Sequence, residues 1–514
     1  MSWSETTQKD LPQDATAPPQ ARRWLVLAVL STSLLLCGID LTVLHVAVPS
    51  MTEDLRPTAV QLLWVVDIYS LTLAALLVTC GTLGDRIGRK RMVLSGFAVF
   101  GAASAGAAFS ASTTQLIIAR VALGVGAAMI MASTVAIIRV VFTDERERAL
   151  AIGIWTSAHS VGATVGPLLG GLVTASWGWG AVFLINVPIV LVILVVGTRV
   201  IPESKNSEPR TWDITSVALS ITGLAGVVYA LKQAGDHIGV DGAILVTGIG
   251  GALLLAAFIR RQGRLSQPLL DFSLFANRRF STATICVISC FGSYVALLFF
   301  LTQWLQQVGK YTPLAAGLAL MPLAGANAMG ATLAPWVANR MGNRGALVGG
   351  LSLFAVALAV LAVSGDSAHY GYMVGPVLCA GFGAGIIMTL GADSIMGAAD
   401  PERSGEAAAI QETSFELGAG LGVAVLGTVL AATYRVTLPQ VPGLSPEDQQ
   451  AAGGSIGAAE QLIGDLTPAT ARQLWASAQH AYDVGFTAVV SIAAVILACT
   501  AVLAAVLLRP RVRT

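Results

Sequence analysis

Long apolar runs separated by short polar gaps constrain this chain more than any other feature. A run of about 18 or more apolar residues is long enough to cross the hydrocarbon core of a membrane as a helix. The sequence therefore predicts an all-α integral membrane protein with 14 transmembrane helices. The runs lie near residues 24–48, 59–81, 92–110, 114–140, 149–174, 178–200, 212–231, 241–260, 280–307, 313–338, 345–364, 371–397, 405–432 and 483–508.

The composition argues against a soluble protein. Only 11% of the 514 residues are charged and 55% are hydrophobic, whereas a soluble chain carries about 25% charged residues. The six cysteines lie in apolar runs without a Cys-x-x-Cys spacing, so we expect neither disulfides nor a metal site. There is no phosphate-binding loop, and the arginine-rich gaps are short loops beside the membrane. We expect no enzyme activity, no nucleic-acid partner and no cofactor.

Positive charge predicts the orientation of the chain. Lysine and arginine gather in every second gap, for example at Arg89 and Lys90 after the second run and at Arg146 and Arg148 after the fourth. Loops with such an excess stay in the cytoplasm, and the even number of runs places both termini there. The polar residues 1–21 are expected to form a disordered cytoplasmic tail. The run that follows is too long for a signal peptide.

An internal repeat predicts two related halves. Residues 84–90 (GDRIGRK) follow the second run, and residues 338–344 (ANRMGNR) follow the tenth, eight runs later. A weaker echo relates residues 144–146 to residues 400–403 at the same offset. Two six-helix halves with two extra helices between them explain this offset, and such parallel halves bind substrate between them near the middle of the membrane.

The repeat and the runs together set the expected domain boundaries. We predict an N-terminal six-helix bundle at 22–203, a linker with two inserted helices at 204–270, and a C-terminal six-helix bundle at 271–514. The second bundle contains one long extracellular loop, at 435–481. Ser-Pro and Thr-Pro pairs at 445–446 and 467–468 predict two short helices that form a hairpin there, as a lid or as a surface insertion.

The segment "GTLGDRIGRKR" is a candidate conformational switch. Its glycines allow the chain to reverse sharply beside a cluster of charges, which can lock the two halves in one state and release them in the other. A plain cytoplasmic anchor is the alternative. The residues that would form the switch are Gly81, Gly84, Asp85, Arg86, Gly88 and Arg89.

A second candidate switch is the segment "SVGATVGPLLGG". Gly162, Gly166 and Gly170 recur at intervals of four, so that another helix can lie directly against this bare stripe. Pro167 removes a backbone donor at the centre of the stripe and favours a kink. Ordinary small-residue packing is the alternative, but the proline favours a moving interface.

Three charged residues are expected in one layer of the membrane. Counting about 1.5 Å per residue from the helix ends places Asp40, Asp67 and Arg120 in the outer half. Mutual neutralisation of these groups is the alternative to function. One arginine can neutralise only one of the two carboxylates. The carboxylate that remains in excess can carry a proton or meet a cation.

The second half has its own acids and aromatic residues. Glu412 and Glu416 share one helix face, and no lysine or arginine inside the second-half runs balances them. They suit proton or cation binding better than a structural role. Tyr294, Phe299 and Trp304 are packing or interface residues by default. Facing a cavity, however, their rings would bind flat lipophilic cations.

These motifs together resemble the drug:proton antiporters of the major facilitator superfamily, in its fourteen-helix branch, over about residues 22–508. "GTLGDRIGRKR" resembles the loop signature of the family, and "SVGATVGPLLGG" resembles the signature of exporters. "DLTVLHVAVP" and "WGWGAVFLINVP" resemble patterns of the fourteen-helix branch. "QLLWVVDIYSL" and "AAAIQETSFELG" are similar to exporters of quaternary ammonium compounds and dyes.

The resemblance implies residue roles. Asp40, Asp67 and Arg120 would couple transport to protons, and Glu412 and Glu416 would meet cationic substrate or protons. The sequence departs from the family pattern in two ways. His45 stands where many relatives have asparagine and adds a titratable group near Asp40, which would alter the pH dependence. Asn327, a predicted substrate-binding residue, and Gln411 stand where some relatives carry acids, which argues against dications.

The predicted function is a proton-coupled antiporter that exports lipophilic cationic drugs, dyes and quaternary ammonium antiseptics from the cytoplasm. Its expected partners are these cations, protons and lipid, and it is expected to act as a monomer in the inner membrane of a bacterium. The alternative is a dedicated exporter of one endogenous antibiotic or metabolite. A membrane sensor or lipid-handling module on the same scaffold is a third possibility.

Overall fold

The computed structural model describes residues 20–204, 213–236, 242–265, 268, 272–363, 370–397 and 404–508, and within them the chain consists of helices joined by short connections. This is the all-α class that the sequence predicts. The predicted tail at 1–21 lies almost wholly outside the described residues, as do the first part of the linker and the echo at 400–403.

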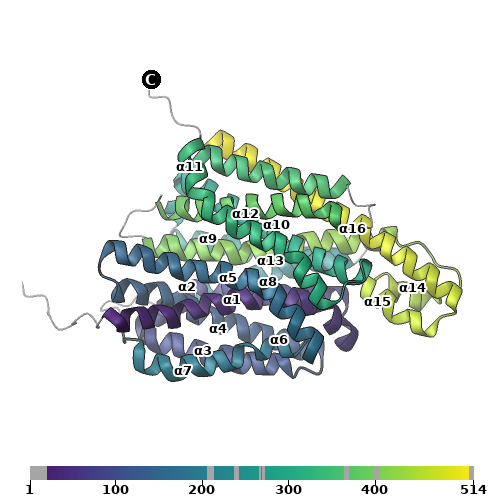
Figure 1. Cartoon of the computed structure of the whole chain (residues 1–514), viewed down its shortest axis with the longest axis horizontal. Coiled ribbons are helices and arrows are strands. Elements are labelled where there is room, and N and C mark those ends of the chain that lie inside the picture. Colours follow the sequence, from purple (N-terminus) through teal and green to yellow (C-terminus); the bar gives the residue numbers. More distant parts are fainter. Residues whose placement is uncertain are drawn as a thin grey trace, which may run out of the picture.

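The first half of the chain forms helices that lie together on one side of the molecule, coloured purple to blue in Figure 1. Side-chain caps start several of them. The Thr58 hydroxyl, for example, accepts a hydrogen bond from the Gln61 backbone N–H at the start of α2, and the Gln61 side-chain oxygen accepts one from the Thr58 backbone N–H. The helices are α1 (Gln20–Leu55), α2 (Ala59–Ile87), α3 (Arg89–Ala108), α4 (Thr113–Val141), α5 (Glu145–Trp177), α6 (Ala181–Leu184) and α7 (Asn186–Val200).

The remaining helices are α8 and α9, which lie between the two halves in the chain order, and those of the second half, coloured green to yellow in Figure 1. The pair is α8 (Ile214–Asp236) and α9 (Gly242–Gln262). The second half contains η1 (Phe272–Ala276), α10 (Arg278–Gln303), the π-helical turn η2 (Trp304–Val308), α11 (Pro313–Val363), α12 (Gly371–Gly397), α13 (Ser404–Thr437), α14 (Pro446–Ala452), α15 (Ile456–Leu462), η4 (Ile463–Asp465) and α16 (Pro468–Leu507).

Most of these helices have the length and hydropathy of membrane spans. Among the described residues, 11 helices are long and apolar enough to cross a membrane, and shorter apolar segments occur at Val165–Trp177 and Ile214–Ala230. One of the 11, α11, covers two of the predicted runs. The backbone at Gly342 is not helical, and its φ of 73° is readily adopted only by glycine, so α11 consists of two helices, one for each run, that meet at a kink.

The last predicted run starts much earlier than its hydropathy indicates. Thr467 caps α16 and Pro468 occupies its first turn, so the helix begins at Pro468 and not near residue 483. The predicted helix start at Thr467 is therefore correct, but it opens α16 and not a second short helix of the hairpin. The short helices in the loop are α14 and α15, each capped by a serine.

The two halves meet along two pairs of helices. On one side α5 packs against α11, and on the other α2 packs against α13. Helix α8 packs on both α2 and α13, where Leu71, Val228 and Ala424 form a small buried cluster. In Figure 1, α1 begins and α16 ends on the left, opposite α14 and α15. Helix α8 therefore lies beside the contact between α2 and α13, and α9 packs on α8.

The sequence repeat recurs in the geometry of the two loops. Gly88 and Gly342 hold the same place in the repeat, and both have positive φ angles, 110° and 73°. Two residues later, Lys90 Nζ donates to the Thr198 carbonyl of α7 at 2.7 Å, and Arg344 donates to the Ala505 carbonyl of α16 at 2.6 Å. Each loop is thus tied to the last long helix of its own half.

Candidate functional site

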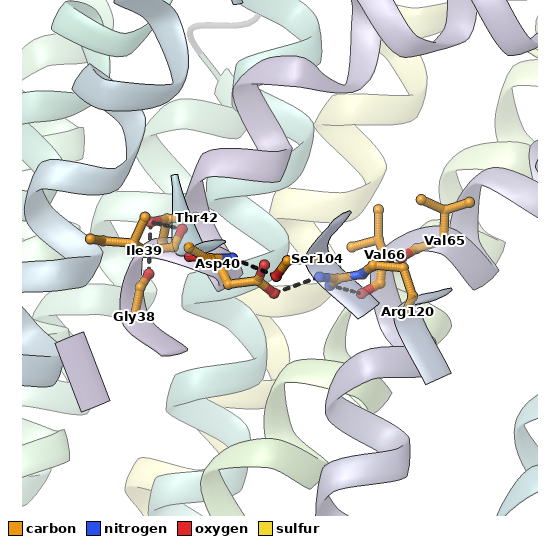
Figure 2. A network of polar contacts seen from close by, with 9 residues as sticks. Gly38, Ile39, Asp40, Thr42, Val65, Val66, Ser104 and Arg120 are labelled. Carbon is orange, nitrogen blue, oxygen red and sulfur yellow. Dashed lines mark hydrogen bonds and ion pairs between the residues drawn. The ribbon is translucent and has the colours of Figure 1, made fainter. Parts of the chain in front are cut away.

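A buried ion pair lies at the centre of the first half. Asp40 on α1 and Arg120 on α4 are 0% and 1% exposed, and Arg120 Nη1 donates to Asp40 Oδ2 at 2.6 Å. Figure 2 shows the two side chains pointing toward each other between their helices. Removing one partner of such a pair leaves a buried charge without compensation, at a cost of about 3–5 kcal/mol.

The other donors of the Arg120 guanidinium fix it to α2. Nε donates to the Val65 carbonyl at 3.0 Å and Nη2 to the Val66 carbonyl at 3.3 Å. The ring of Tyr69 lies 4.6 Å from the guanidinium carbon, so it adds a cation–π contact. Arg120 thus links three helices of the first half at one point.

Asp67 follows these two carbonyls directly on α2. Its side chain is buried, at 1% exposed, inside the apolar run in which the sequence placed it. The sequence predicted that Asp40, Asp67 and Arg120 share one layer, and the structure brings Arg120 to Asp40 and to the α2 backbone beside Asp67. The ion pair is made by Asp40, which depth alone could not decide.

The carboxylates of α13 face this cluster from the second half. Glu416 is 5% exposed and Glu412 is half-buried. The Glu416 carboxyl lies close enough to interact electrostatically with Glu412 on its own helix and with Ser70 and Arg120 of the first half. The cluster therefore spans the contact between the halves, with more carboxylates than cations among these residues.

The predicted aromatic residues divide into two groups. Tyr294 and Phe299 are buried on α10, and the Phe299 ring lies 5.4 Å from the ring of His45 on α1, across the contact between the halves. The Trp304 indole instead donates to Asp483 Oδ1 at 2.7 Å, which ties η2 to α16. Asn327 is half-buried, and its amide contacts Met388 Sδ of α12 at 3.6 Å.

A cavity lies near these aromatic side chains. Its wall is formed by α2 of the first half, by α10, α13 and α16 of the second, and by the connection between α14 and α15. It carries no charged side chain. The lining residues are Leu62, Leu63, Phe299, Phe300, Gln303, Gly427, Leu430, Ala431, Tyr434, Gly454, Ser455, Ile456 and Tyr482.

The glycine stripe of α5 lies against α1. A side-chain carbon at Gly162 would meet the Leu35 carbonyl, one at Gly166 would meet Thr42, and one at Gly170 would lie 2.9 Å from the Val43 carbonyl. The predicted close helix contact is therefore present.

The proline of the stripe lies at a second contact. The backbone of Pro167 faces Gly317 of α11, so α5 is in close contact with both halves at once.

The loop between α2 and α3 is held by the end of the first half. Gly88 ends α2, and the backbone N–H of Arg89 donates to the Ser204 carbonyl at 3.0 Å. Glu203 accepts from the Lys90 backbone at 3.3 Å. Gly84 packs against Ser133 of α4, Gly81 faces Ala132, and Arg86 is exposed. The side chain of Asp85 lies outside the described residues.

Comparison with known proteins decides the family. The family model for the Major Facilitator Superfamily matches residues 30–423. The chain belongs to the Major Facilitator Superfamily. It is a membrane transporter and not an enzyme, as the sequence predicted.

Several bacterial proteins match most of the chain. The chain is 39% identical to the multidrug efflux pump LfrA of Mycolicibacterium smegmatis, over 96% of this chain and 98% of that protein. It is 35% identical to the methyl viologen resistance protein SmvA of Salmonella typhimurium, over 90% and 93%. The tetracenomycin C resistance and export protein of Streptomyces glaucescens is 30% identical over 82% of this chain and 78% of that protein.

Solved structures agree on the superfamily fold. A bacterial homologue of the human lysosomal transporter Spinster, in an inward-facing and occupied conformation, superimposes with a TM-score of 0.67 at 17% identity and covers 95% of this chain and 97% of that one. At this identity the likeness concerns the fold alone.

The sequence pattern does not identify two acidic residues that the structure shows to be important. It places Asp483 at the start of the last run, whereas Asp483 lies well inside α16 and accepts the Trp304 hydrogen bond. The Thr-Pro helix start at residue 467 was the signal that could have placed it there. Glu203, which binds the loop between α2 and α3, had no local signal, because its partners are more than 100 residues away.

Proposed function

We propose that this protein is a proton-coupled antiporter that exports lipophilic cationic drugs, dyes and quaternary ammonium compounds. The observation that carries the proposal is the cluster at the contact between the halves. The Asp40 carboxylate pairs with the Arg120 guanidinium, and the Glu416 carboxylate of the second half interacts electrostatically with that guanidinium and with Glu412. Asp67 is buried directly after the two α2 carbonyls that Arg120 binds. Efflux is supported by the relatives, among which are a multidrug efflux pump and a resistance protein named for methyl viologen.

The charge imbalance suggests how coupling would work. Arg120 is paired with Asp40, whereas Glu416 Oε2 has no hydrogen-bond partner among the described residues. Because a buried carboxylate oxygen without a hydrogen bond is costly, such a group tends to bind a proton or a cation. A lipophilic cation that meets Glu412 and Glu416 would displace protons, and protons entering from outside would displace the cation.

The fold supplies a route for alternating access. Contacts that join the halves at the end near α15 are a bond from Gln306 Nε2 to the Val46 carbonyl at 2.9 Å and one from Gln461 Nε2 to the Thr52 carbonyl at 3.0 Å. We propose that these bonds close the outer end in this arrangement. They would break when the halves rock about the contacts of α5 with α11 and of α2 with α13.

The topology completes the proposal. Counting α11 as two spans, and α6 with α7 as one, gives fourteen spans, with residues 22–203 and 271–514 as the two bundles and 204–270 as the inserted pair. Both termini would lie in the cytoplasm, with the loop at 435–481 outside. The bacterial relatives support the inner membrane of a bacterium. The protein would work as a monomer, without a cofactor, on the proton gradient.

A second candidate is a dedicated exporter of one endogenous antibiotic. The observation that favours it is the 30% sequence identity to the tetracenomycin C resistance and export protein of Streptomyces glaucescens. Such an exporter would move one compound class and ignore unrelated cations.

Purified protein in liposomes with a trapped pH dye separates these functions. Adding tetraphenylphosphonium or ethidium should move protons in the wild type, and Asp40→Asn or Asp67→Asn should abolish this movement while the protein stays folded. A wild-type protein that moves no proton with either cation would refute the proposal and favour the dedicated exporter.

A further inference from the structure

The imidazole of His45 is buried without a hydrogen-bond partner. The side chain is 1% exposed, and neither Nδ1 nor Nε2 bonds to any described residue. A buried polar atom left unsatisfied is costly, so each such atom in a native structure needs an explanation. Structural packing alone does not explain why an imidazole is retained here, because an apolar side chain would fill the space without this penalty.

His45 faces the other half of the transporter. Its ring lies 5.4 Å from the ring of Phe299 on α10, with the planes inclined at 54°. Phe299 also lines the cavity between α2, α10 and α13. Phe299 thus contacts the imidazole and also lines a cavity at the contact between the halves.

The backbone at the same place has a further acceptor. Pro49 lies four residues after His45 inside α1 and has no N–H, so the α-helical bond to the His45 carbonyl cannot form. The next carbonyl, that of Val46, accepts the 2.9 Å bond from Gln306 Nε2. This bond ties the α1 backbone beside His45 to the second half and so holds the imidazole next to Phe299.

We propose that His45 is a specificity-determining residue that hydrogen-bonds substrates carrying N–H groups. A neutral imidazole offers one donor and one acceptor, and the carbonyl freed by Pro49 adds an acceptor. The Phe299 ring beside it provides a flat surface for an aromatic substrate. Substrates with aromatic amines satisfy the imidazole when the halves separate. Cations without N–H groups form no such hydrogen bond with His45. The inference rests on the proposed export of lipophilic cations.

Two cations separate this role from others. Ethidium and tetraphenylphosphonium are both permanent, lipophilic monocations, but only ethidium carries aromatic amines. Proton-driven transport of each is measured in liposomes for the wild type, His45→Leu and His45→Asn. Leucine removes the hydrogen-bonding groups at similar volume, whereas asparagine keeps one donor group and one acceptor. Thermal unfolding of each purified variant in detergent checks the fold.

The expected result is selective. His45→Leu should raise the KM for ethidium at least fivefold and leave that for tetraphenylphosphonium within twofold, with His45→Asn between wild type and His45→Leu for ethidium. The unfolding temperature of His45→Leu should stay equal or rise, since the unsatisfied nitrogens are gone. If transport of both cations falls in parallel, His45 belongs to proton coupling and the proposal is overturned. Unchanged transport of both cations would also overturn it. Wild-type protein that moves neither cation would instead refute the proposed function.

Discussion

Thr42 of α1 occupies the space that a side chain at residue 166 of α5 would need. A β-carbon at Gly166 would overlap the Thr42 hydroxyl, and that hydroxyl donates to the Gly38 carbonyl at 2.9 Å. The two helices are therefore in contact through a glycine and a threonine that have no room for an added methyl group.

Replacing Gly166 by alanine should accordingly impair both stability and transport. Overpacking of this kind costs about 1–3 kcal/mol, and a displaced α5 would also disturb its contact with α11. The matched control is Gly106→Ala on α3, where a β-carbon meets nothing within 4 Å and alanine should be neutral or slightly stabilising. The double variant Gly166→Ala/Thr42→Ala should recover part of the loss. No recovery would mean that Thr42 is not the obstacle.

The Asp40–Arg120 pair should show strong energetic coupling. Arg120→Gln should destabilise the protein by about 3–5 kcal/mol, because it leaves the Asp40 carboxylate buried and unpaired. Arg120→Lys should be only partly better, since an ammonium cannot make the separate bonds to Asp40 and to the Val65 and Val66 carbonyls. A double-mutant cycle with Asp40→Asn, followed by unfolding in detergent, measures the coupling. Additive effects of the two changes would argue against the pair.

The bond between Trp304 and Asp483 should anchor η2 to α16. Trp304→Phe keeps an aromatic ring but removes the N–H that donates to Asp483 Oδ1 at 2.7 Å. A hydrogen bond to a charged group contributes about 1.5–3 kcal/mol. We expect Trp304→Phe and Asp483→Asn each to lower stability and the double variant to lower it by less than their sum.

Transport assays on these two variants separate anchoring from substrate contact. If Trp304 acts only through Asp483, then Trp304→Phe and Asp483→Asn should change the KM for cations equally. A larger change in KM for Trp304→Phe than for Asp483→Asn would support the substrate contact that the sequence predicted for Trp304.

Gly342 should tolerate no other residue without strain. Its φ of 73° and ψ of 156° lie in a region that is adopted almost only by glycine, and other residues there cost about 1–3 kcal/mol. A β-carbon at Gly342 meets nothing within 4 Å, so the whole penalty of Gly342→Ala would come from the backbone. Gly349→Ala, a helical position with room for the methyl group, is the control. Equal unfolding temperatures for Gly342→Ala and Gly349→Ala would contradict the backbone strain expected at residue 342.

The amino-acid sequence by itself determined the membrane class, most of the helices, the repeat and the residue types of the site. Runs of apolar residues report the thickness of the membrane directly. Glycine spacing likewise reports a close helix contact, such as that at Gly166. These patterns involve residues that are close in the sequence, so they can be recognised without a structure.

Tertiary structure decided which residues meet. Depth along a helix can be counted, but its rotation depends on packing against helices distant in the chain. The sequence therefore could not choose between Asp40 and Asp67 as the partner of Arg120, nor place Glu416 near that guanidinium. The same holds for Trp304 and Asp483, which lie 179 residues apart in the chain. It also holds for His45, whose contact with Phe299 and missing partners depend on how the two halves close on each other.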